Sequence, residues 1–128
     1  RTHIFIDEIH VLFENKYSAS FFNSAWRQFR KRNAYPTAIT QNVDSLLASV
    51  DSRTMLSNSE FIVMLSQATS DRDKLAELLS ISDEQLSYIT GAQAGCGLIR
   101  YGSLLVPFIN EFPKDTKLYK LMTTKPGE

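Results

Sequence analysis

Short apolar stretches alternate along the chain with longer segments whose apolar residues recur at helical spacing. The apolar stretches predict three strands, at residues 4–6, 35–40 and 61–65. Between the first two, residues 19–32 carry Phe22, Trp26 and Phe29 at helical spacing, followed by Asn33 as a C-terminal cap. Strands that alternate with helices in this way predict an α/β fold.

Residues suited to helix caps mark the starts of further helices. Asn42 predicts a short helix with one apolar stripe, formed by Val43, Leu46, Leu47 and Val50. A Ser followed three residues later by Asp or Gln has the spacing of a capping box, and this spacing predicts helices over residues 70–79 and 82–89.

The C-terminal part of the chain has a different pattern. Residues 94–101 and 104–109 predict an antiparallel hairpin with Gly102 at its turn, and residues 117–122 predict a closing helix. We therefore expect residues 1–128 to form a single α/β domain that ends in a hairpin and a short helix.

Composition narrows the function classes without naming one. With 43% hydrophobic and 22% charged residues, the chain is typical of a globular protein. Its 14 basic and 14 acidic residues balance, so we expect no net electrostatic field that would attract nucleic acid to the molecule as a whole. The single Cys96 excludes an internal disulfide and suits a reducing compartment. Apolar runs of only a few residues predict no membrane insertion by this part of the protein.

Two adjacent carboxylates end the first predicted strand. An apolar strand that delivers Asp7 and Glu8 to the rim of a sheet has the Walker B arrangement of a P-loop ATPase. In that chemistry Asp7 holds the Mg²⁺ that bridges the phosphates, and Glu8 polarises the attacking water as general base. The alternative is an ordinary strand end with acidic residues on a solvated loop.

The sequence lacks a G-x-x-x-x-G-K-[ST] segment, so it has no loop of backbone amides to hold phosphates. Because the chain begins at Arg1 and enters the first strand at once, we expect the phosphate loop upstream. The sequence therefore predicts half of a nucleotide site, and we expect this chain alone to be inactive and to bind no cofactor.

Further candidates for phosphate chemistry flank the second strand. Gln41 follows that strand. It is either a loop residue that forms a structural hydrogen bond, or a ligand-binding residue at the rim where α/β sheets bind ligands. Arg27, Arg30 and Lys31 form either a solvated helix face or a source of positive charge for a transferring phosphoryl group.

Two other interpretations are weaker. His3, Asp7 and His10 suggest a metal cluster, but they lack a fourth ligand, so we expect Mg²⁺ only together with nucleotide. The aromatic residues at 21–29 suggest a platform for stacking bases, although aromatic residues at helical spacing are more typical of a core.

Six sequence motifs, taken in order, carry a resemblance to a known family: IFIDEIH, WRQFRKR, AITQN, SDRDKLAELL, LVPFINEFP and LYKLMTTKPGE. Together they resemble the C-terminal end of the VirB-four-like ATPases of conjugative type IV secretion systems, in the version carried by conjugative transposons of Gram-positive bacteria. The resemblance covers essentially the whole chain. It implies the C-terminal portion of a RecA-like P-loop motor of the HerA/FtsK type, with a mostly parallel sheet flanked by helices.

The resemblance also implies roles for individual residues. Asp7 and Glu8 match the Walker B pair, and Gln41 matches the Gln that senses the γ-phosphate. Arg30 matches the Arg that such motors insert into a neighbouring subunit's site, a role that Arg27 or Lys31 can share. In such sheets the phosphate-loop strand lies between the strands at 35–40 and 61–65. We therefore expect the chain alone to pair these two strands directly, or to fill the gap from another chain.

For the full-length protein, the resemblance implies an ATPase that uses ATP and Mg²⁺ and forms a ring, expected to be a hexamer. It is expected to work with other type IV secretion components in the cytoplasm, at the inner face of the cell membrane. Two alternatives stay open: a non-catalytic docking or assembly module of the secretion channel, and a DNA-translocating motor, which the balanced charge does not support.

Overall fold

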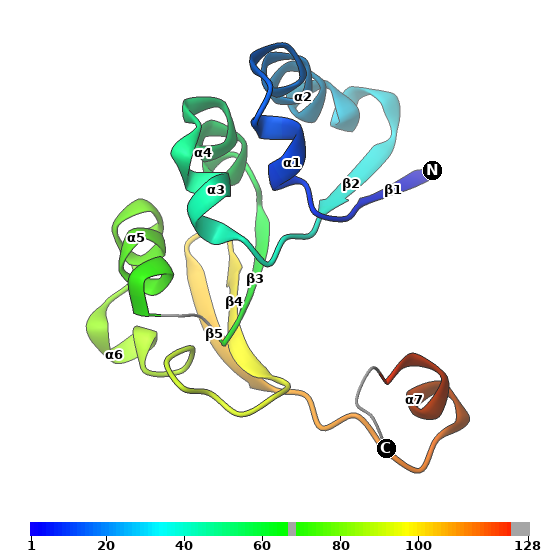
Figure 1. Ribbon diagram of the computed structural model, residues 1–128, viewed down its shortest axis with the longest axis vertical. Coiled ribbons are helices and arrows are strands. Elements are labelled where there is room, and N and C mark those ends of the chain that lie inside the picture. Colours follow the sequence, from blue (N-terminus) through cyan, green and yellow to red (C-terminus); the bar gives the residue numbers. More distant parts are fainter. Residues whose placement is uncertain (67–68, 124–128) are drawn as a thin grey trace.

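The computed structural model describes residues 1–66 and 69–123, in which the strands form two separate sheets (Figure 1). The strands are β1 (Thr2–Ile6), β2 (Ala34–Ala38), β3 (Phe61–Leu65), β4 (Cys96–Tyr101) and β5 (Leu104–Ile109). β1 and β2 are parallel, whereas β3, β4 and β5 form an antiparallel sheet in that order. The alternation of strands and helices and the C-terminal hairpin are confirmed.

Helices connect and cover these sheets. They are α1 (His10–Phe13), α2 (Lys16–Phe29), the 3₁₀ helix η1 (Arg30–Arg32), α3 (Val43–Ala48), α4 (Val50–Ser57), α5 (Thr69–Leu79), α6 (Asp83–Leu86) and α7 (Lys117–Met122). In the described part of the chain, no helix is long and apolar enough to cross a bilayer.

Several helix boundaries follow the predicted caps. Asn33 has a left-handed backbone (φ 53°) and ends η1, as predicted. Asn42 caps α3 by accepting a 2.9 Å hydrogen bond from Ser45 N, and Ser82 forms a complete capping box with Gln85. The cap predicted at Ser70 lies outside the described side chains. Gly102 (φ 57°) occupies the two-residue turn of the hairpin, as predicted.

The structure also differs from the sequence prediction. Ser49 has an extended backbone and divides the predicted apolar helix into α3 and α4, so Val50 begins a new helix and is 68% exposed. The helix predicted at 19–32 begins earlier, at Lys16, because Asn15 accepts a hydrogen bond from Tyr17 N.

Two clusters of buried residues form the core. The larger one packs helices against one face of β3 and β4, and contains Val43, Leu47, Met64, Leu75, Leu79, Ile81, Leu86, Ile89 and Leu98. The smaller one joins α1, α2, α3 and α4 beside β1 and β2, and contains Ile9, Phe13, Ala19, Leu46 and Met55. Phe22 and Trp26 of the predicted aromatic stripe pack against the smaller cluster. Helix α3 contributes to both clusters.

The expected direct pairing of the second and third predicted strands is wrong for this chain. Among the described residues, β2 pairs only with β1 and β3 only with β4, so the two inner strand edges stay unpaired. The single, mostly parallel sheet is likewise replaced by one parallel pair and an antiparallel sheet. The physical reason is packing: α3 and α4 connect β2 to β3, and α3 is buried in both clusters through Leu46 and Leu47, so each strand pairs with the neighbour inside its own sheet.

The antiparallel sheet has one covered and one bare face. On the covered face, Met64 and Leu98 are almost fully buried under α5 and α6 (Figure 1). The opposite face presents six large apolar side chains that are each 50% to 63% exposed: Phe61, Val63, Leu65, Tyr101, Leu104 and Val106. We call these six residues the bare face. Soluble monomers rarely expose contiguous apolar areas of this kind, so the bare face indicates a missing partner surface.

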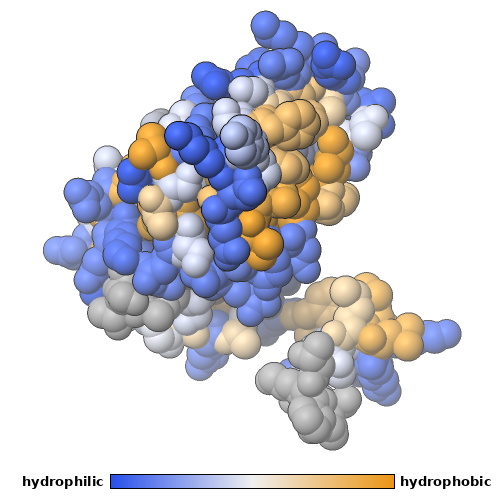
Figure 2. All heavy atoms as spheres, turned by 45° about the horizontal axis from the view of Figure 1, so that its top comes forward, coloured by the Kyte–Doolittle hydropathy of each residue, from blue (hydrophilic) through white to orange (hydrophobic). Residues whose placement is uncertain are grey.

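Helix α7 stands apart from both sheets at the end of the segment that follows β5 (Figure 1). Its Leu118, Leu121 and Met122 are 54% to 73% exposed and share one helical face. Figure 2 shows hydrophobic residues gathered on one side of the body and again on this separate C-terminal segment.

Candidate functional site

The carboxyl ends of β1 and β2 meet at one edge of their parallel sheet. Beyond the strands, Ile39 N donates to Ile6 O (2.9 Å) and Ile9 N donates to Ile39 O (3.0 Å). These two bonds hold the Asp7–Glu8 turn at both ends. They also place the turn beside Thr40 and Gln41, which follow Ile39 directly. The structure therefore brings the two predicted acids next to the segment that carries the predicted sensor.

The turn itself is strained. Glu8 has a left-handed backbone (φ 49°), which is uncommon for a residue with a side chain and costs about 1–2 kcal/mol. Glu8 N donates to Asp7 Oδ1 at 3.0 Å, which orients the exposed Asp7 carboxylate over the turn. Ile9, which is completely buried, anchors the turn to the core. Strain that the surrounding fold maintains in this way is typical of functional sites.

A histidine contacts both sides of this edge. His10 Nδ1 and Thr40 Oγ1 share a 2.9 Å hydrogen bond, and the same nitrogen lies 3.2 Å from Glu8 Oε2. The side chain of His10 is only 14% exposed. Glu8 Oε2 is itself buried and has no hydrogen-bond partner within residues 1–66 and 69–123. Glu8 Oε2 and His10 Nδ1 are therefore close enough for an ion pair, but they do not form a hydrogen bond.

Gln41 is exposed and lies in the bend between β2 and the cap of α3. The bend is ordered by its neighbours, since Asn42 N donates to Thr40 Oγ1 at 3.1 Å. Its position at the carboxyl edge agrees with the rim where open α/β sheets bind ligands.

The predicted basic residues lie elsewhere. Arg27 is in the last turn of α2, with Nε donating to Asn23 O at 3.3 Å, and Arg30 and Lys31 are in η1. Because η1 leads into the start of β2, it lies at the amino end of the parallel pair. Five strand residues, or about 16 Å, separate it from the carboxyl edge. The structure does not bring these three cations to Asp7 and Glu8 of the same chain.

His10 and Thr40 are the site residues that the sequence analysis did not identify. The sequence pattern suggests His10 only as part of a metal cluster with His3 and Asp7, whereas in the structure His3 stacks on the ring of Tyr35. Both residues lie close in the sequence to predicted site residues: His10 follows the acidic pair by two residues, and Thr40 directly precedes Gln41. This closeness in sequence identifies His10 and Thr40 as site residues only when the parallel register of β1 and β2 is known, because the register brings the two segments together.

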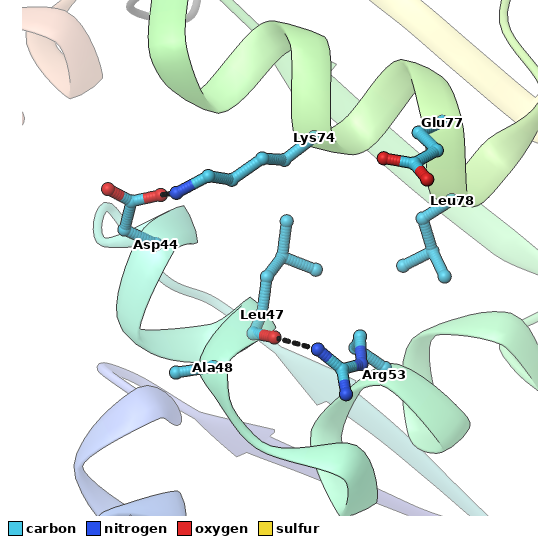
Figure 3. A pocket seen from close by; sticks show the side chains of 7 residues that line it. All are labelled: Asp44, Leu47, Ala48, Arg53, Lys74, Glu77 and Leu78. Atoms are coloured by element: carbon cyan, nitrogen blue, oxygen red, sulfur yellow. Dashed lines mark hydrogen bonds and ion pairs between the residues drawn. The ribbon is translucent and has the colours of Figure 1, made fainter.

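A hollow of about 620 Å³ lies beside α3, and its lining contains none of the residues of this edge (Figure 3). It is formed by α3, α4 and α5, and is lined by Asp44, Leu47, Ala48, Arg53, Lys74, Glu77 and Leu78. Lys74 bonds to Asp44 across it; this contact lowers the pKa of Asp44 and raises the pKa of Lys74. Arg53 Nη1 donates to Leu47 O at 3.0 Å. The predicted site residues do not line the hollow, and three of its polar side chains, those of Asp44, Lys74 and Arg53, are engaged in structural contacts.

The chemistry of the carboxyl edge fits Mg²⁺ with a nucleotide. Asp7, Glu8, Thr40 and Gln41 offer oxygen ligands, which Mg²⁺ prefers, and Mg²⁺ is usually bound by one or two carboxylates together with substrate phosphates. Within residues 1–66 and 69–123, no group of three or more His, Cys, Asp or Glu side chains is placed to hold a metal ion by itself. The exposed Asp7 carboxylate at this edge could bind Mg²⁺ only together with ligands from another molecule, such as the phosphates of a nucleotide.

Comparison with solved structures gives a likeness to a known protein. The fold is similar to that of part of VirB4 of Thermoanaerobacter pseudethanolicus, with a TM-score of 0.79 and 24% sequence identity over 88% of this chain. The chain spans 32% of the length of that VirB4 structure. No protein-family model and no curated protein sequence matches the chain. The mixed α/β fold of this chain is therefore that of a part of VirB4.

Proposed function

We propose that this chain is the C-terminal part of the motor domain of a type IV secretion ATPase related to VirB4. The observation that carries the proposal is the strained Asp7–Glu8 turn, held beside Thr40 and Gln41 at the carboxyl edge of a parallel strand pair. The likeness of the fold to part of VirB4 and the sequence motifs support it independently. The motifs further favour the version carried by conjugative transposons of Gram-positive bacteria.

In this function each residue of the edge has a separate task. Asp7 would hold Mg²⁺, which would supply positive charge against the phosphates when Mg-ATP is bound, and Gln41 would sense the γ-phosphate. Glu8 accepts a proton from the attacking water. Arg30 of one subunit contributes positive charge to the site of its neighbour, with Arg27 or Lys31 as substitutes in that role. The position of η1 at the opposite end of β1 and β2 supports action between subunits rather than within one.

The unpaired edges of β2 and β3 and the bare face support an incomplete domain. We propose that an upstream segment with the phosphate-binding loop inserts its strand between β2 and β3, and that further upstream helices cover the bare face. In this proposal residues 1–128 are half of one motor domain, and the full-length protein is a cytoplasmic hexamer at the inner face of the membrane that works with other secretion components.

Substitution of Glu8 in the full-length protein tests the catalytic function. Glu8→Gln keeps the size of the side chain and removes the base, so ATP should bind while turnover falls by about two to four orders of magnitude. Asp7→Asn should weaken the coordination of Mg²⁺ as well, so that more Mg²⁺ is needed for turnover. The exposed Glu14 provides a matched control, because Glu14→Gln should leave turnover unchanged. Normal turnover in the Glu8→Gln variant would refute the proposal.

A docking or assembly module is the second candidate function. The bare face and the exposed apolar residues of α7 favour it, because both are surfaces that partner proteins can cover. If Glu8→Gln abolishes ATP turnover but leaves secretion intact, this second function is the correct one. A motor that moves DNA remains the third alternative; salt-dependent binding of DNA by the full-length protein would favour it.

A further inference from the structure

We infer that His10 is a positioning residue for Glu8, and that it makes the placement of the Glu8 carboxylate depend on Thr40. The inference rests on the proposed function, since it gives His10 a task in the hydrolysis assigned to Glu8. It adds a connection between the general base and the segment that carries Gln41.

One ring nitrogen lies within reach of two oxygen atoms. His10 Nδ1 is 2.9 Å from Thr40 Oγ1, with the geometry of a hydrogen bond, and 3.2 Å from Glu8 Oε2 without that geometry. With the proton on Nδ1, the tautomer on which the inference rests, the single N–H points well at only one acceptor at a time. Hydrogen bonding of His10 to Thr40 and to Glu8 is therefore competitive.

The competition has an energetic basis. A buried carboxylate oxygen without a donor is costly, and Glu8 Oε2 is such an atom. A small rotation of the imidazole toward Glu8 satisfies this oxygen and fixes the carboxylate, but it withdraws the ring from Thr40. The imidazole of His10 has little room for other movements, because the side chain is mostly buried and the preceding Ile9 is hydrogen-bonded to Ile39.

Thr40, the other hydrogen-bonding partner of His10, belongs to the segment that carries Gln41. Thr40 Oγ1 accepts from Asn42 N at 3.1 Å, so the hydroxyl is located by the same bend that contains Gln41. A displacement of this bend moves Thr40 and so decides whether the His10 N–H is available to Glu8. Contact of Gln41 with a γ-phosphate would in this way orient the base from the other strand.

Two substitutions of His10 in the full-length protein separate this role from simple packing. Asn carries its amide near the position of Nδ1, whereas Gln carries its amide near the position of Nε2. We expect His10→Gln to lower kcat about 10–100-fold with the KM for ATP nearly unchanged, as for lost partners of catalytic ligands. His10→Asn should retain most of the activity. His3→Gln is the matched control and should leave kcat unchanged, because His3 contacts Tyr35 instead.

Hydrogen–deuterium exchange supplies a readout that does not depend on activity. If His10 holds the bend through Thr40, backbone amides at 40–42 should exchange several-fold faster in His10→Gln and in Thr40→Val than in the wild type or in His10→Asn. Unchanged exchange at these amides would overturn the inference.

The two proposals fail in different ways. In a Glu8→Gln background, His10→Gln should cause no further loss of turnover, because the base it positions is gone. Wild-type kcat in His10→Gln, or equal losses in His10→Asn and His10→Gln, would overturn the role of His10 while Glu8→Gln still abolishes turnover. Normal turnover in Glu8→Gln alone would instead refute the proposed function.

Discussion

Asn23 Nδ2 donates a 2.6 Å hydrogen bond to Asp51 Oδ1, and this bond joins α2 to α4. It is partly buried, and Asn23 Oδ1 has no partner among the described residues, so the bond to Asp51 is the one that orients the amide. Because α2 leads into η1, the same bond helps to hold Arg27 and Arg30 in place.

Removal of this bond should destabilise the chain. We expect Asp51→Ala to lower the free energy of unfolding by about 1–2 kcal/mol, because it leaves a partly buried amide without its acceptor. Urea unfolding of the 128-residue chain measures the effect, with Glu111→Ala at an exposed position as control. Equal midpoints for the two variants would show that the bond does not contribute to stability.

The bare face should make the isolated chain associate with itself. Exposed apolar side chains beside unpaired strand edges favour contacts between copies, so sedimentation should show dimers or larger species. Val63→Lys combined with Val106→Lys should yield monomers, whereas Tyr17→Lys, at an exposed residue of α2, should not. A wild-type chain that stays monomeric at high concentration would contradict this prediction.

The isolated chain should bind Mg-ATP only weakly. Two carboxylates repel a polyphosphate unless a cation lies between them, and the sequence contains no phosphate-binding loop. Calorimetry should therefore show no tight binding. A dissociation constant below about 1 µM would mean that the nucleotide site lies elsewhere in the chain.

Arg30 should act on the neighbouring subunit. We expect full-length Arg30→Ala to bind nucleotide normally and to lose about three to five orders of magnitude in turnover, as for other arginines supplied between subunits. Mixing it with Glu8→Gln should restore part of the activity, because some interfaces then combine an intact Glu8 with an intact Arg30.

Two results would contradict the assignment to Arg30. One is the absence of restored activity when subunits are shown to exchange. The other is full activity of Arg30→Ala together with an inactive Arg27→Ala variant, which would transfer the role to Arg27.

Local chemistry explains which features the sequence could predict. Asn42 and Ser82 cap through side-chain bonds to residues three positions away, and Asn33 adopts the left-handed backbone that Asn tolerates, so these caps depend mainly on local sequence. The break at Ser49 is held instead by side chains of the next helix, because Ser52 Oγ donates to Leu46 O and Ser49 O, and Arg53 Nη1 donates to Leu47 O. Apolar spacing alone does not distinguish one helix from two in this stretch.

In the candidate site, too, some features follow from local sequence and others from contacts between distant segments. The sequence placed Asp7 and Glu8 at the end of a strand, which the structure confirms. The left-handed backbone of Glu8 was not predictable, because the two hydrogen bonds of Ile39 that impose it come from a strand thirty residues away. The contact between His10 and Thr40 depends on the same parallel register.

Helix α3 begins directly after Asn42, and its neighbouring residues Leu46 and Leu47 are buried in different core clusters. Close-packed interiors resist small deformations, so α3 cannot turn without repacking both clusters. A displacement of residues 40–42 is then not absorbed locally. Through α3 it reaches both clusters, so we expect the carboxyl edge of β1 and β2 and the packing of the two sheets to respond together.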